Sequence, residues 1–146
     1  MGSFRYGKIK KQSTKDYSVR YNQPKTQENL RGEVDGIPAS DLEERAHKAI
    51  RGVVRVYSEP QVAIPGNIPG QDKQLDVLAY TVPPTPINID GFIGHHTAEQ
   101  RGEDSFRDWI INDFGMKQGW NFVQSWREYD LDTQDQADAK ARRELG

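Results

Sequence analysis

The apolar residues between positions 42 and 50 fall at i, i+4, i+7 and i+8, which predicts an amphipathic helix with one buried side. The run Ser40-Asp41-Leu42-Glu43 is a capping box, in which the serine hydroxyl and the Glu43 carboxylate each accept a hydrogen bond from the other residue's backbone amide. We therefore expect this helix to begin after Ser40 and to end at Gly52.

A second helix is predicted after another capping box, which pairs Thr97 with Gln100. The apolar residues that follow recur at helical spacing, and Gly115 is expected to end the helix. This predicted apolar stripe consists of Phe106, Trp109, Ile110 and Phe114.

Shorter runs rich in β-branched and aromatic residues predict strands. We expect strands at 74–82, 87–90 and 119–126, preceded by a short β-branched run at 53–57 and a long proline-containing loop at 58–74. The order helix, strand, strand, strand, helix, strand predicts a small α/β domain, with a short mixed sheet flanked by helices.

The two ends of the chain differ in composition from this central part. Residues 26–39 are polar and contain two glycines and a proline, which is typical of a linker. The C-terminal part is also polar and is expected to be helical around 137–145. The chain is therefore predicted to comprise an extended basic arm with its linker (1–39), an α/β domain (40–131) and a polar C-terminal helix or tail (132–146).

The overall composition narrows the class of protein. Only 34% of the residues are hydrophobic, 29% are charged, and the mean hydropathy is -0.89, which indicates that part of the chain does not contribute to a core. No apolar stretch is long enough to span a membrane, and the N-terminus lacks the apolar run of a signal peptide. A cytoplasmic or virion-associated protein is therefore expected. The absence of cysteine excludes disulfides, Cys-ligated metal sites and a thiol nucleophile.

Charge is distributed unevenly along the chain. The first 25 residues hold seven basic side chains against Asp16, a net charge of +6, and the remainder therefore carries -8. Aromatic residues are interleaved with the basic ones, which suits an arm that lies along DNA phosphates and stacks on bases. A solvated tail, or a contact with other protein subunits of an assembly, fits the same composition. The residues assigned to nucleic-acid binding are Arg5, Lys8, Lys10, Lys11, Lys15 and Arg20.

Polar residues in and after the predicted strands are the candidates for chemistry. Asp76 lies within an apolar strand, where a buried charge costs several kcal/mol unless it is paired. Asp90 ends the next strand, and His95 and His96 follow it in a loop. Two carboxylates at one sheet edge suit a hard divalent cation, and a nearby imidazole could deprotonate an attacking water. The competing interpretations are an ion pair for Asp76, turn chemistry for Asp90 and polar loop positions for the histidines.

Other conspicuous residues are expected to have structural roles. His47 is expected at the surface of the first helix, because its neighbours are charged. Arg107 and Asp108 are expected to orient the second helix rather than to touch a substrate. Core and rim packing is the expected role of Trp109, Trp120 and Trp126.

The stretch PINIDGFIGHHTAEQ…DSFRDWIINDFG…GWNFVQSWREYDL resembles the core of the PD-(D/E)XK restriction-endonuclease superfamily. It is most similar to the branch that contains the very-short-patch repair endonucleases. The shared pattern runs from an acidic residue near a helix start, through a strand aspartate and an Asp-Gly followed by histidine, to an Arg-Asp pair and a Gly-Trp strand. The resemblance spans about residues 40–131 and includes Glu43 (or Glu44), Asp76, Asp90-Gly91, His95, Arg107-Asp108, Gly119-Trp120 and Asp130-Leu131.

The resemblance implies a metal-dependent DNA endonuclease that hydrolyses phosphodiester bonds, with Mg²⁺ or Mn²⁺ as the cofactor. Carried over by position, it makes Asp76 the principal metal ligand. The backbone carbonyl of Ile89, or Asp90 itself, completes the protein ligands. His95 is implied as the general base, and Glu43 as an acid near the metal-bound waters.

One departure from the superfamily pattern leaves other interpretations open. The strand carries Asn88-Ile89-Asp90 where the superfamily has Glu-x-Lys, although the mismatch-repair branch also lacks that pair. The alternative is a catalytically inactive nuclease fold that serves as a structural or assembly component of a phage particle or another large complex. A nucleic-acid-binding accessory protein without catalysis is a third interpretation. Carboxylates of Asp76 and Asp90 around a metal-sized gap favour the enzyme, whereas an aspartate locked to an arginine favours the structural role.

Overall fold

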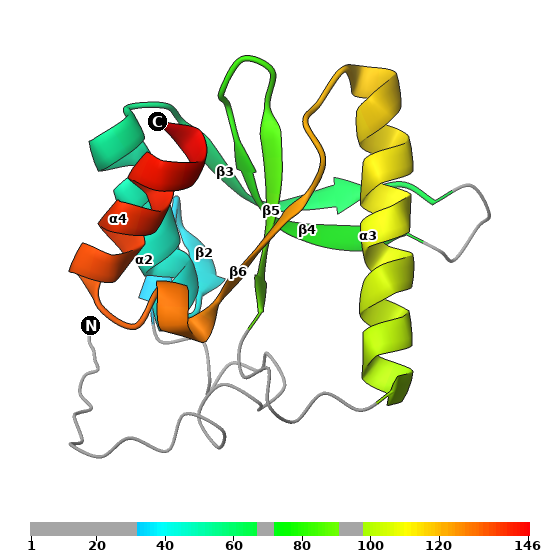
Figure 1. Cartoon of the computed structure of the whole chain (residues 1–146), viewed down its shortest axis with the longest axis horizontal. Helices are drawn as coiled ribbons and strands as arrows, with labels where there is room; N and C mark the ends of the chain where they lie inside the picture. Colours follow the sequence, from blue (N-terminus) through cyan, green and yellow to red (C-terminus); the bar gives the residue numbers. More distant parts are fainter. Residues whose placement is uncertain (1–31, 67–71, 91–97) are drawn as a thin grey trace.

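The computed structural model describes residues 32–66, 72–90 and 98–146. These residues form an α/β fold in which a four-stranded mixed sheet and a separate two-stranded hairpin are accompanied by helices (Figure 1). The predicted fold class and the order of the main elements are therefore confirmed, whereas the basic arm and the candidate base His95 lie outside the described residues.

The main sheet has the strand order β3-β4-β5-β6. Its strands are β3 (Ser58–Ile64), β4 (Lys73–Ala79), β5 (Thr85–Asp90) and β6 (Gln124–Arg127). The first three form antiparallel pairs, and β6 pairs parallel to β5. A parallel neighbour requires a long crossover connection, which the helix α3 (Ala98–Gln118) provides between β5 and β6.

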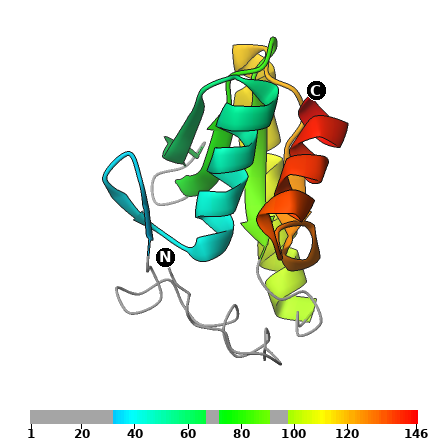
Figure 2. The same ribbon diagram turned by 90° about the vertical axis from the view of Figure 1, so that its left-hand side faces the viewer.

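Helices cover both faces of this sheet (Figures 1 and 2). The helix α2 (Asp41–Ala49) continues as a π-helical turn, η1 (Ile50–Val54), and packs beside α4 (Gln134–Leu145) on one face. Helix α3 lies on the other face. Strand β4 therefore supplies buried side chains to a separate layer of core on each face of the sheet.

Two buried clusters correspond to these layers. The larger lies between the sheet and the α2–α4 pair, and its strand residues are Val77, Ala79, Ile87, Ile89 and Trp126. The smaller lies beneath α3, and its fully or nearly buried members are Ile64, Leu75, Leu78, Ile110 and Ile111.

The predicted start of the first helix is confirmed. Ser40 Oγ accepts a hydrogen bond from Glu43 N at 3.2 Å, and Glu43 Oε1 accepts one from Ser40 N at 2.9 Å. The helical path continues past Gly52 and ends at Arg55, whose φ of 64° places it in the left-handed region.

Residues 32–39, expected as part of a linker, instead form the antiparallel hairpin of β1 (Gly32–Val34) and β2 (Ile37–Ala39). The turn of this hairpin takes positive φ at both Asp35 and Gly36, a geometry that these residue types tolerate. The hairpin is tied to α2 because Glu44 Oε2 accepts a hydrogen bond from Glu33 N at 3.0 Å.

The expected strand boundaries need correction in two places. The β-branched run at 53–57 is not a strand, because it lies in the π-helical turn and the connection that follows it. The first strand of the main sheet, β3, lies instead within the stretch expected to be a loop. Of the strand expected at 119–126, only the end is extended, because β6 begins at Gln124.

The stripe predicted for α3 is only partly buried. Ile110 is buried, but Phe106 and Trp109 are exposed, and Gly115 lies inside the helix rather than at its end. The polar C-terminal segment, in contrast, contributes to the core: Ala137 and Ala141 of α4 are fully buried against α2 and the sheet. None of the helices within the described ranges combines the length and hydrophobicity that crossing a bilayer requires.

We expect Ser40→Ala to lower the free energy of unfolding by about 1 kcal/mol, because the substitution removes the acceptor for Glu43 N. Urea denaturation monitored by circular dichroism measures this change. Ser40→Asp is the matched control, since a carboxylate also caps helices, and it should retain most of the stability. Equal losses in the two variants would contradict the capping role.

Candidate functional site

The candidate site begins at Asp76, at a position where the sheet is interrupted on both sides. The pairing of β3 with β4 joins Pro60 to Val77 and Val62 to Leu75, and leaves out the intervening Gln61, whose φ is 51°. On the other side, the pairing of β4 with β5 ends at Val77 and Ile87. Asp76 therefore lies at a one-residue break in the β3–β4 ladder and just beyond the end of the β4–β5 ladder.

The carboxylate of Asp76 replaces part of the missing ladder. Its Oδ2 accepts a hydrogen bond from the backbone amide of Ile89 at 2.7 Å, and the residue is only 5% exposed. A buried backbone N–H without an acceptor is costly, so this bond stabilises both the strand and the buried charge. Asp76, predicted as the principal site residue, is thus fixed between two strands.

Two further polar residues lie on β5, the strand to which Asp76 is bonded. Asn88 and Asp90 alternate along β5 with Ile87 and Ile89, which belong to the core on the α2–α4 side. Their side chains therefore face α3, as Leu78 of β4 does. The structure places one buried carboxylate, one buried amide and one half-buried carboxylate on adjacent strands.

Helix α3 contacts this group through its Arg-Asp pair. Asn88 Nδ2 donates a hydrogen bond to Asp108 Oδ1 at 2.9 Å, and Arg107 Nη2 lies 3.4 Å from Asp90 Oδ1. Because the Asn88 amide nitrogen donates to a carboxylate, its Oδ1 must point elsewhere. That oxygen is buried and accepts no hydrogen bond from the described residues.

Other predicted site residues have different placements. Glu43 is buried at the start of α2 and caps that helix, as its sequence position indicated. Ile89 is 8% exposed and belongs to the larger core cluster. Arg107 is not confined to orienting its helix, because it reaches Asp90 on the neighbouring strand.

The contact between Arg107 and Asp90 is the observation that favours a structural role. Arg107 Nη2 and Asp90 Oδ1 are 3.4 Å apart, and the two side chains are 25% and 14% exposed. Within the described parts of the chain, no three carboxylate or imidazole groups gather closely enough to hold a metal. The predicted set also includes His95, which lies outside those parts.

His47 is buried, although nothing in the sequence indicated its burial. It was expected at the surface but is only 2% exposed, and its Nδ1 lies 2.5 Å from Ser58 Oγ. Ser58 Oγ accepts from Arg51 Nε, so its own hydrogen is available to Nδ1 and the ring hydrogen belongs on Nε2. His47 Nε2 is buried without a partner among the described residues.

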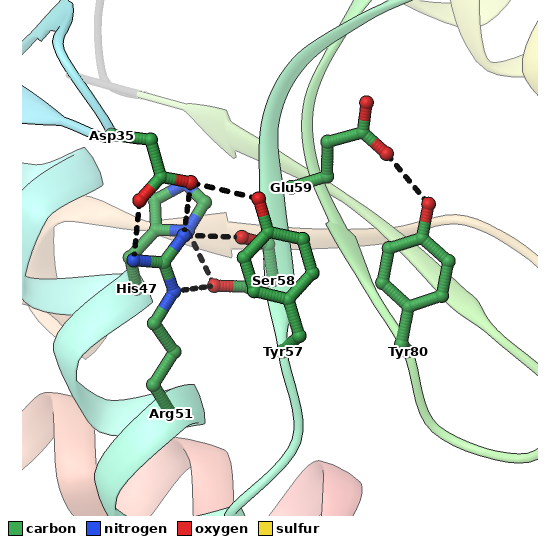
Figure 3. Close-up of polar contacts among 7 residues, drawn as sticks. All are labelled: Asp35, His47, Arg51, Tyr57, Ser58, Glu59 and Tyr80. Atoms are coloured by element: carbon green, nitrogen blue, oxygen red, sulfur yellow. Dashed lines mark hydrogen bonds and ion pairs between the residues drawn. The ribbon is translucent and has the colours of Figure 1, made fainter.

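Arg51 is the centre of this second polar cluster (Figure 3). Its guanidinium donates to both carboxylate oxygens of Asp35 at 3.0 and 2.8 Å and to the backbone carbonyl of Ser58. It also lies 4.9 Å from the ring centre of Tyr57. These bonds connect the β1–β2 hairpin, η1 and the start of β3.

The electrostatics of this cluster keep its groups in fixed protonation states. Burial, followed by the charge of Arg51, lowers the pKa of His47 to about 4. The hydrogen bonds from Arg51 and Tyr57 lower the pKa of Asp35. Tyr80 donates its hydroxyl to Glu59 at 2.6 Å, which raises the pKa of Tyr80 to about 12. Near neutral pH the histidine is therefore neutral and the tyrosine is protonated.

Comparisons of the chain with protein families, with curated proteins and with solved structures find no match. The assignment of a function therefore depends on the geometry of the two clusters and on the chemistry of their residues.

We expect acid to destabilise the protein through His47. The folded pKa of about 4 lies below the unfolded value of 6.5, so this residue's contribution is complete above pH 6.5 and is lost as the pH falls towards 4. The loss should be about 3 kcal/mol in the free energy of unfolding between pH 7.5 and pH 4.

Urea denaturation of the wild type and of His47→Asn over this range measures the effect. The difference between the two proteins is the informative quantity, because burial raises the pKa of Glu128 to about 6 and gives an opposite pH dependence in both. Parallel pH profiles for the two proteins would show that His47 does not cause the acid sensitivity.

Proposed function

We propose that the protein is a metal-dependent DNA endonuclease that hydrolyses phosphodiester bonds. The observation that carries this proposal is the buried Asp76, held by the Ile89 amide at the point where β4 and β5 separate. A buried charge that a core does not require is a candidate functional group. On β5, the strand to which Asp76 is bonded, Asn88 and Asp90 offer further oxygen donors.

The donor chemistry fits a hard divalent cation. Asp76, Asp90 and the Ile89 carbonyl offer oxygen atoms, and Mg²⁺ or Mn²⁺ prefers such ligands. The buried Asn88 Oδ1, which has no partner within the described residues, is a further oxygen of the same kind. When bound, such a cation neutralises the scissile phosphate and lowers the pKa of the attacking water.

Other residues of the chain would bind the phosphates of the substrate and accept the proton of the attacking water. Arg107 is one-quarter exposed beside Asp90, where its guanidinium can bind a phosphate oxygen of the substrate. His95, assigned as the general base from the sequence alone, would take the proton of the attacking water. The basic residues of the arm would contribute phosphate affinity that the remainder of the chain, with its net charge of -8, does not supply.

A second candidate is a nuclease-like fold without catalysis that serves as a structural or assembly component. Two observations favour it: the contact between Arg107 and Asp90, and the neutral Asn88 at a position where the superfamily carries a carboxylate. In this case the basic arm would bind other subunits of a large complex.

We expect the purified protein to nick supercoiled plasmid in Mg²⁺ or Mn²⁺ but not in EDTA, and Asp76→Asn to reduce nicking to background. An asparagine at position 76 can still accept the hydrogen bond from Ile89 N, so the fold should be retained while the charge is lost. Agarose gel electrophoresis of the plasmid forms over time measures the rate.

Asp72→Asn is the matched control, because Asp72 is an exposed aspartate just before β4 and should leave the rate unchanged. Metal-dependent nicking that depends on Asp76 but not on Asp72 would support the endonuclease. A folded wild type that cleaves in neither metal would overturn it and favour the structural candidate.

A further inference from the structure

Two exposed aromatic rings lie on α3 beside the candidate site. Phe106 and Trp109 are 41% and 55% exposed, although both belong to a stripe that the sequence assigns to the core. Their rings are parallel within 5°, with centroids 6.4 Å apart. Parallel rings this far apart overlap little, so each leaves much of its face uncovered. We call this pair of exposed rings the α3 platform.

The α3 platform is adjacent in the sequence to residues that contact the candidate site. Arg107 and Asp108 lie between its two rings in the sequence and contact Asp90 and Asn88 on β5. The platform therefore lies within one helical turn of the residues that contact the candidate site.

A lysine side chain from β4 lies next to the α3 platform. Lys73 Nζ lies 5.4 Å from the ring centre of Phe106. Lys73 begins β4 and is three residues from Asp76, which corresponds to about 10 Å along a strand.

We infer that the α3 platform stacks an unpaired base of the DNA strand whose phosphate occupies the candidate site. This inference rests on the proposed endonuclease function. A flat aromatic face binds any base through its π-surface, and an adjacent lysine attracts the phosphate of the same strand. The platform would hold the strand beside Asp76 without reading its sequence.

The other exposed ring pair provides a control within the same molecule. Tyr57 and Tyr80 are also exposed and stacked, with centroids 5.8 Å apart. Their hydroxyls donate to Asp35 and Glu59, however, so this pair is held by contacts within the fold. Arg51, the nearby cation, is already bonded to Asp35.

The test measures the affinity of the full-length protein for a fluorescently labelled single-stranded oligonucleotide by anisotropy, in EDTA so that no cleavage occurs. We expect Trp109→Ala to weaken binding about tenfold, Trp109→Phe to restore most of the affinity, and Tyr57→Ala to have no effect. A set of oligonucleotides carries a single abasic site at a different position in each. At one of these positions the missing base should weaken binding by the wild type, and Trp109→Ala should then cause no further loss of affinity.

Several outcomes would overturn the inference. Equal affinities of wild type and Trp109→Ala would do so, as would an equal loss from Tyr57→Ala. Sedimentation showing a dimer that Trp109→Ala dissociates would assign the platform to a second copy of the chain instead. Failure of the endonuclease is distinguishable, because a wild type that never nicks plasmid can still show the Trp109-dependent affinity for single strands.

Discussion

The hydrogen bond from Ile89 N to Asp76 Oδ2 is the interaction on which the candidate site depends. The regular pairing of β4 with β5 stops at Val77 and Ile87, so the two strands are free to separate beyond this point. Without an acceptor, the buried Ile89 amide would oppose that separation, since unpaired backbone groups are costly in a core. One carboxylate therefore allows the sheet to open while each strand keeps its direction, and it places Asn88 and Asp90 beside the opening.

The two faces of the sheet differ in a way that suits this arrangement. Between α2 and α4 the core contains fully buried alanines, which let the two helices approach each other closely. They are Ala46, Ala49, Ala137 and Ala141. The α3 face has the smaller core, and polar contacts between α3 and β5 continue it towards the site. Rigid packing on one face thus supports a polar, partly open face on the other.

Local signals in the sequence predicted much of the fold, and non-local contacts account for the errors. The capping box at Ser40 and the apolar strands around Asp76 and Ile87 depend on neighbouring residues, so their patterns were readable. Strand β3 was missed because it contains Pro60 and polar residues and is only partly buried. His47 was misplaced because its partner Ser58 lies on β3, and nothing in the sequence of α2 indicates that contact. Asp76 was singled out because a charge within an apolar strand is a local anomaly, and the structure shows it buried there.

The contact between Arg107 and Asp90 is weaker than the structural ion pair between Arg51 and Asp35 in the same molecule. Arg51 binds Asp35 through two hydrogen bonds of 3.0 and 2.8 Å, whereas Arg107 Nη2 lies 3.4 Å from Asp90 Oδ1. A phosphate that binds the quarter-exposed Arg107 would compete with Asp90 for its guanidinium. The same contact that favours a structural role is thus compatible with a site that rearranges when its substrate binds.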